Sequence, residues 1–185
     1  MFQAVLTNAA QQDWAIKHVD VKSAYLNAPL KGGIFMKPPR GELEPGQKGK
    51  VLRLLKGLYS LKQAGREWYL EMARVLMKDM KELEFKQSRI YHSFFYHMTE
   101  EEHTIITVAT DEMAIMSKRE INANNFKSKI KWFWDITDHG PIEWFLGFKI
   151  RQNKNERTLL INQQAYIEMM VKKLHSLMQK ELQCL

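Results

Sequence analysis

The sequence predicts an α+β fold, in which helices and an antiparallel sheet are combined in one domain. Segments with an apolar residue at every second position and segments with apolar residues at every third or fourth position both occur, but they do not alternate regularly along the chain. The chain has 185 residues, of which 45% are hydrophobic and 26% charged. Its length and composition are those of a folded domain and not of a disordered chain, a collagen or a coiled-coil rod.

The first predicted element is a strand at residues 14–22, WAIKHVDVK, whose side chains alternate between two faces. Asp20 lies near its end. Glycine and proline pairs surround a short extended piece, IFMK, within residues 31–50, and they indicate turns on both sides of it. From Glu67 the apolar residues recur at helical spacing as far as Leu83, which predicts a helix with one buried face.

Two β-rich runs, SFFYHMT at 93–99 and TIITVAT at 104–110, are followed by MAIMS at 113–117. Only Asp111 and Glu112 separate the second run from the third. We therefore expect a hairpin with carboxylates at its tip.

The last third of the chain predicts a basic helix over 122–134, then a turn and a strand within HGPIEWFLGFKI at 139–150. A last short strand, TLLIN, follows at 158–162. Asn162 is placed to cap a helix from 163 to about 177. The inner face of that helix is expected to carry Tyr166, Met170, Leu174 and Leu177.

The net charge of +7 is concentrated in one part of the chain, residues 31–66, which we call the basic segment. It holds two acidic residues and nine basic ones, and the latter are Lys31, Lys37, Arg40, Lys48, Lys50, Arg53, Lys56, Lys62 and Arg66. Such a block, interleaved with apolar side chains, suits a surface that follows nucleic-acid phosphates. A solvated basic face without a ligand is the alternative.

The single cysteine, Cys184, cannot form a disulfide within the chain. The N-terminal residues lack the basic-then-apolar layout of a secretory signal, and no apolar run reaches the length of a membrane span. We therefore expect an intracellular protein, in cytoplasm or nucleus, with no disulfide partner and no membrane association.

Three carboxylates, those of Asp20, Asp111 and Glu112, would meet if their two strands were neighbours in one sheet. Ligand sets made only of oxygen suit Mg²⁺. Two such ions can activate a hydroxyl and stabilise a leaving pyrophosphate. The alternative is that each acid is simply solvated at a strand end or turn, where Asp is common.

Four segments carry a family resemblance, in order: HVDVKSAYLNAPLKGGIFMKPPRG, VLRLLKGLYSLKQAGREWY, GPIEWFLGFKI and LLINQQAYIEMMVKKL. Together they resemble the reverse transcriptase of copia-type retrotransposons. The resemblance implies a right-hand polymerase palm, an antiparallel sheet backed by helices. It also implies RNA-directed DNA polymerisation with two Mg²⁺ ions, or Mn²⁺, acting on deoxynucleoside triphosphates and an RNA or DNA primer–template.

Carried over by residue, the resemblance makes Asp20 and Asp111 the metal-binding acids, with Glu112 as a third catalytic acid. Val21 would lend its backbone carbonyl to the nucleotide site. Tyr25 would be the aromatic gate beside the sugar, although it could equally be a core aromatic. Gln63 is the candidate nucleotide contact of the LKQAGREWY block, and the expected nucleic-acid contacts are Lys50, Arg53, Lys56, Lys62 and Arg66.

The chain departs from the family at the hairpin, where Ala109-Thr110-Asp111-Glu112 stands in place of Tyr-x-Asp-Asp. Glu112 is one methylene longer than aspartate, and Ala109 lacks the ring that packs beneath the primer end. Gly65 replaces a proline. Because a misplacement of about 1 Å can cost roughly 100-fold in rate, we expect impaired catalysis.

The resemblance also implies an incomplete polymerase, with residual fingers and no full thumb. On this basis residues 1–178 form the partial reverse transcriptase domain and residues 179–185 a tail. Two alternatives are a non-catalytic nucleic-acid-binding remnant and a product that does not fold stably because its sheet edge is uncovered.

Overall fold

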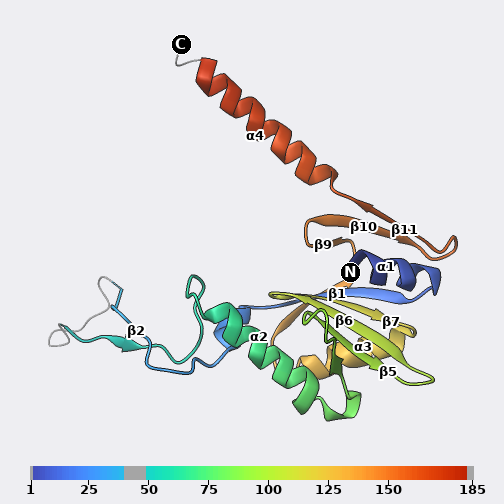
Figure 1. Cartoon of the computed structure of the whole chain (residues 1–185), viewed down its shortest axis with the longest axis horizontal. Coiled ribbons are helices and arrows are strands. Elements are labelled where there is room, and N and C mark those ends of the chain that lie inside the picture. The colour runs from blue at the N-terminus through green and yellow to red at the C-terminus, as the bar shows by residue number, and fades with distance from the viewer. Residues whose placement is uncertain (1, 40–48, 183–185) are drawn as a thin grey trace.

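The computed structural model describes residues 2–39 and 49–182, and its centre is a six-stranded antiparallel sheet (Figure 1). The strands follow the order β4 (Lys86–Gln87), β5 (Phe94–Met98), β6 (His103–Ala109), β7 (Glu112–Ser117), β1 (Ala15–Val21) and β8 (Ile136–Pro141). Helices pack against this sheet, and the α+β prediction is therefore confirmed.

Strand β1 contributes side chains to two separate cores, as its alternating sequence predicted. Val19 and Val21 lie in a core shared with helices α2 (Ala64–Arg74) and α3 (Glu120–Ile130). Ile16 lies in a second core on the opposite face of the sheet. The two cores are possible because successive side chains of a strand point to opposite faces.

The second core is covered by helix α1 (Phe2–Gln11), which the sequence analysis did not predict. Its buried residues are Leu6, Ala9 and Ala10, at helical spacing, and the ring of Phe2 lies 4.9 Å from that of Phe145. Only three of its ten residues are buried, and two of these are alanines. This helix is therefore stabilised mainly by the sheet that it covers.

The predicted helix from Glu67 begins three residues earlier, at Ala64, as α2. The helix continues as a π-helical turn, Val75–Asp79, and a separate 3-10 turn, Lys81–Leu83, follows. The predicted apolar stripe is confirmed as far as Met80, and its buried members are Trp68, Met72, Val75, Leu76 and Met80. Leu83 lies outside the helix, on the 3-10 turn.

The described part of the basic segment forms a small ladder, in which β2 (Phe35–Met36) pairs with β3 (Leu52–Arg53). The short extended piece predicted at IFMK is thus present in part. In Figure 1 this ladder lies apart from the six-stranded sheet. Arg40 and Lys48 of the basic segment fall outside the described residues.

The turn predicted within HGPIEWFLGFKI falls at Leu146 and Gly147. Residues 139–141 of this segment belong to β8 and pair with β1. The pairing contains a register shift between His18 and Val19, and Gly140 takes a φ of 75°. A glycine tolerates that conformation without steric cost. Helix α3 also begins two residues before the predicted start and ends at Ile130, four residues before the predicted end.

The C-terminal part forms a three-stranded sheet of β9 (Trp144–Phe145), β10 (Phe148–Asn153) and β11 (Thr158–Asn162), followed by helix α4 (Gln164–Leu182). The side chain of Asn162 accepts a hydrogen bond from the backbone N–H of Gln164 at 3.4 Å, which supports the predicted cap. The predicted inner face is wrong at Tyr166 and Leu174, which are 51% and 56% exposed, and the side chain of Leu177 lies outside the description. Figure 1 shows the reason: α4 extends away from both sheets.

No helix within residues 2–39 and 49–182 is long and apolar enough to cross a membrane.

Candidate active site

The predicted acidic hairpin is formed by β6 and β7, and Ala109 pairs with Glu112 across it. Thr110 and Asp111 are left as a two-residue turn, which we call the acidic turn. Because β1 is the other neighbour of β7, Asp20 lies directly opposite Glu112. The structure thus brings Asp20, Asp111 and Glu112 to one end of adjacent strands.

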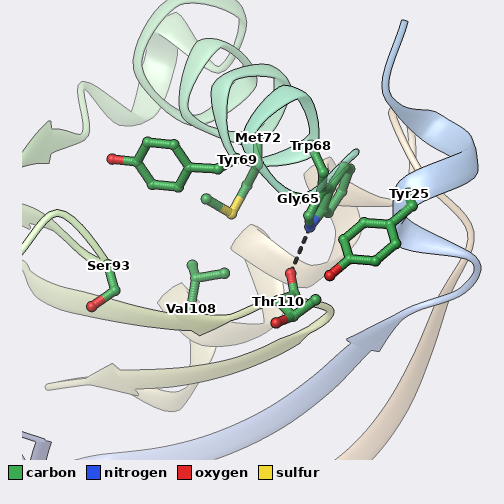
Figure 2. A pocket seen from close by; sticks show the side chains of 8 residues that line it. All are labelled: Tyr25, Gly65, Trp68, Tyr69, Met72, Ser93, Val108 and Thr110. Carbon is green, nitrogen blue, oxygen red and sulfur yellow. Dashed lines mark hydrogen bonds between the residues drawn. The ribbon is translucent and has the colours of Figure 1, made fainter. Parts of the chain in front are cut away.

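Two hydrogen bonds to backbone carbonyls hold the acidic turn, one from a backbone N–H and one from a side chain. The N–H of Val21 donates to the carbonyl of Asp111 at 2.8 Å. The indole N–H of Trp68, on α2, donates to the carbonyl of Thr110 at 2.6 Å, which Figure 2 shows as a dashed line. Thr110 has a φ of 57°, which is strained for a β-branched residue.

The carboxyl groups of the site repel one another. Partial burial, and then the charge of Asp111, raise the pKa of Asp20, while His139 opposes this shift. Partial burial also raises the pKa of Glu112. The charges of Asp111 and Asp20 add to that rise, and a hydrogen bond from the backbone of Leu146 opposes it. A bound cation would relieve this repulsion.

The acids suit a metal ion that keeps some of its coordinated water molecules. Within the described ranges, no group of three or more His, Cys, Asp or Glu side chains is arranged to hold a metal ion. Mg²⁺ is commonly bound by only one or two carboxylates, with waters and substrate phosphates completing its octahedron. Asp20 and Asp111 are therefore sufficient in ligand type and number.

A buried histidine lies beneath these acids, and the sequence analysis gave it no role in the site. His18 is 7% exposed, and its ring stacks on that of His139 at 4.6 Å. Its Nε2 lies 3.9 Å from a carboxylate oxygen of Glu112 and has no hydrogen-bond partner within the described residues. Burial and His139 lower the pKa of His18 to about 4, so the ring is neutral near pH 7. The sequence feature that could have identified His18 is its position two residues before Asp20, which places both side chains on the same face of the strand.

Tyr25 lies on a 3-10 helix, Ala24–Asn27, and lines a cavity of about 190 Å³. Figure 2 shows the lining side chains, which come from the 3-10 helix, α2, the turn before β5, β6 and the acidic turn. They are Tyr25, Gly65, Trp68, Tyr69, Met72, Ser93, Val108 and Thr110. Tyr25 is partly buried against the first core, so the core and gate interpretations are compatible.

A second tyrosine, Tyr59, joins Tyr25 near the acids, and the sequence analysis did not select it. The two rings lie 4.8 Å apart. Burial, followed by the charge of Asp111, raises the pKa of Tyr59. Gln63 is exposed immediately before α2 and is not among the residues that line the cavity.

The five predicted nucleic-acid contacts are all exposed, and they are Lys50, Arg53, Lys56, Lys62 and Arg66. None of them forms an ion pair with an acid in the part of the chain that the structure describes. Exposed cations without acidic partners are available to phosphates.

Comparison with known proteins identifies the family. Residues 2–181 match the family described as reverse transcriptase (RNA-dependent DNA polymerase). The chain is 31% identical over 166 residues to the retrovirus-related Pol polyprotein from transposon TNT 1-94 of Nicotiana tabacum, covering 90% of this chain and 12% of that polyprotein. It is 28% identical over 163 residues to the corresponding polyprotein from transposon RE1 of Arabidopsis thaliana, covering 88% and 11% respectively.

The chain thus spans about a tenth of the length of these polyproteins. The matches agree with the resemblance carried by the four sequence segments. The chain therefore belongs to the reverse transcriptase family, as a reverse transcriptase domain of the kind found in retrotransposon Pol polyproteins.

Proposed function

We propose that this chain is the palm portion of an RNA-directed DNA polymerase that acts by two-metal nucleotidyl transfer. The observation that carries the proposal is the direct pairing of Asp20 with Glu112, with Asp111 fixed beside them by the N–H of Val21. The proposed domain comprises residues 1–178 and is followed by a tail at 179–185.

Asp20 and Asp111 would hold Mg²⁺, and Mn²⁺ could replace it. When bound, the ions would activate a primer 3′-hydroxyl and stabilise the leaving pyrophosphate. The chain's own part is to hold the two carboxylates together at one end of adjacent strands. The raised pKa of Asp20 implies that protons compete with the metal as the pH falls.

Tyr25 is proposed to stand beside the sugar of the incoming nucleotide. Its partial burial and its contact with Tyr59 limit its movement, and a fixed ring can exclude a 2′-hydroxyl by contact. Val21 and Gln63 complete the proposed nucleotide site. In this arrangement the exposed cations of the basic segment would attract the primer–template backbone.

Glu112 is proposed to be a compromised third acid. Its carboxylate interacts with the backbone of Leu146 and lies near His18, on the side of the second core. This position supports a role in packing the strand end rather than in holding metal. We therefore expect little catalysis by the unmodified chain.

The test is Mg²⁺-dependent primer extension by the purified chain, with the double variant Glu112→Asp and Ala109→Tyr alongside. We expect slow or no extension by the unmodified chain and a measurable gain in the double variant. Asp20→Asn in the double variant is the matched control and should abolish that gain. Robust extension by the unmodified chain would overturn the claim of impairment, and a gain that survives Asp20→Asn would overturn the assigned site.

A second candidate function is nucleic-acid binding without catalysis, which the five exposed cations without acidic partners favour. It predicts binding that weakens steeply with salt and has little sequence preference. Fluorescence anisotropy with a labelled primer–template at two salt concentrations would measure it. Salt-dependent binding together with no incorporation by any variant would favour this function over the first.

A further inference from the structure

We propose that Trp68 is the positioning residue of the acidic turn: its indole N–H sets where Asp111 stands. The inference rests on the proposed function, because it assumes that Asp111 binds metal. It goes beyond that function by assigning a role to a core residue that does not itself bind metal or nucleotide.

The hydrogen bond from Trp68 to Thr110 is short, and its donor side chain is buried although Thr110 itself is exposed. Its donor–acceptor distance is 2.6 Å, and Trp68 is 2% exposed. A hydrogen bond is electrostatically stronger in such surroundings than in water. If the indole N–H were lost, the carbonyl of Thr110 would lose this partner.

The bond acts on the strained residue of the turn. Thr110 takes a φ of 57°, which a β-branched residue adopts only when its surroundings impose it. Thr110 directly precedes Asp111, so relaxation of its backbone would displace the Asp111 carboxylate. The indole N–H is therefore one of the contacts that keep the strained backbone in place.

Trp68 is itself held firmly enough to act as a reference point. Its ring packs edge-on against that of Trp134 at 4.8 Å, and Trp134 is 5% exposed. The next residue, Asp135, accepts a backbone hydrogen bond from Lys22 at 2.9 Å. The turn is thereby fixed from α2 through Trp68 and from β1 through Val21.

The variant that separates positioning from packing is Trp68→Phe, which removes the N–H and keeps an aromatic ring. Trp134→Phe is the matched control, because it alters the same aromatic pair without touching the turn. We expect Trp68→Phe to weaken Mn²⁺ binding about three- to tenfold, the effect of one lost hydrogen bond. We also expect it to speed amide hydrogen exchange at residues 110–112.

Both variants should lower the melting temperature, but Trp134→Phe should leave Mn²⁺ affinity and exchange at the turn unchanged. If both variants change the two readouts equally, Trp68 only packs the core and the proposal is wrong. If the unmodified chain binds no Mn²⁺, the proposed function fails. In that case, amide hydrogen exchange at residues 110–112 is the one readout that tests whether Trp68 positions the turn.

A measurement on the unmodified chain covers the case in which Trp68→Phe does not fold. The indole proton of Trp68 should exchange slowly in NMR spectra, and that of Trp132, which is 85% exposed, should exchange rapidly. Equal, rapid exchange of both indole protons would overturn the proposal.

Discussion

The acidic turn and the basic segment are held in opposite ways. Both carbonyls of the turn accept hydrogen bonds from other elements, one from the buried side chain of Trp68. The ladder of the basic segment is bonded within the segment, from Leu54 to Ile34, and to the residue just before it, from Leu30 to Leu55. Its apolar side chains are largely open, with Leu55 71% exposed.

The difference follows from what each region is proposed to bind. Metal-assisted transfer depends on placement to within about 1 Å, so the acids require a rigid frame. Attraction to phosphates acts over a screening length of about 10 Å at 0.1 M salt and tolerates a loosely held segment. Changes at the two regions should therefore affect different measurements.

The largest expected effect is at the turn. Asp111→Asn removes a proposed ligand and should weaken Mn²⁺ binding by at least about 100-fold, since even the loss of a group that hydrogen-bonds directly to a ligand side chain costs 10- to 100-fold. Calorimetric titration with Mn²⁺ measures this, while primer–template binding should not weaken. Unchanged Mn²⁺ affinity would show that Asp111 is no ligand.

The next effect concerns acid stability beneath the site. The pKa of His18 is about 4 in the folded chain, below its ordinary value of about 6.5. As the pH falls from 6.5 to 4 the unfolded state therefore takes up the proton first, and on the order of 2 kcal/mol of stability is lost. The groups that face His18 are His139, Glu112 and Phe145.

Asp20 and Glu112 act in the opposite direction over acidic pH. Their raised pKa values mean that the folded state binds protons first, so their contribution to stability is present at low pH and is lost as the pH rises. His18→Phe should remove only the loss of stability that comes from the lowered pKa of His18. Urea unfolding between pH 7 and 4 should show a smaller decline in the variant, and an identical decline would contradict the assignment.

A smaller effect is expected in the basic segment. Changing Lys50, Arg53 and Lys56 to Gln should weaken primer–template binding roughly tenfold. It should also reduce the slope of log affinity against log salt by about 2 to 3, because each phosphate contact contributes about 0.9. Anisotropy measures both quantities. Mn²⁺ affinity should stay the same, and a change in it would show that the two regions are coupled.

The smallest expected effect is a change in melting temperature when the charge of Asp20 is removed. Asp20→Asn removes one of the mutually repelling charges and should raise the melting temperature near pH 7, because the raised pKa of Asp20 marks an ionised form that folding disfavours. The gain should vanish at a pH low enough to protonate Asp20. A melting temperature that falls near pH 7 would mean that the carboxylate supports the fold.

The sequence predicted what depends on local pattern. Alternation at 14–22 predicted β1 and its two faces, and the two residues between apolar runs predicted the acidic hairpin. Contacts between segments that are distant in the sequence produce no such local pattern. The indole bond joins residues 42 positions apart, and the stacking of His18 on His139 depends on the pairing of β1 with β8, which are distant in the sequence.

The error at α4 has a different physical cause. Its apolar spacing is genuine, and a helical stripe ordinarily indicates a buried face. In the described residues that face is largely exposed to solvent, with Tyr166 51% and Leu174 56% exposed. An apolar stripe predicts that some element packs against it. Which element packs there, and where, is decided by the tertiary structure.

Strand β1 separates Val19 and Val21 from Ile16 and His18, so its two faces serve two interiors at once. Deleting a single residue between Ala15 and Asp20 would exchange the faces and send valines and histidine each into the wrong interior. A deletion of the same size in the exposed stretch Lys31–Gly33 would only shorten a connection. Among relatives, we therefore expect no insertions or deletions within β1, and length differences of a few residues in the connection after it.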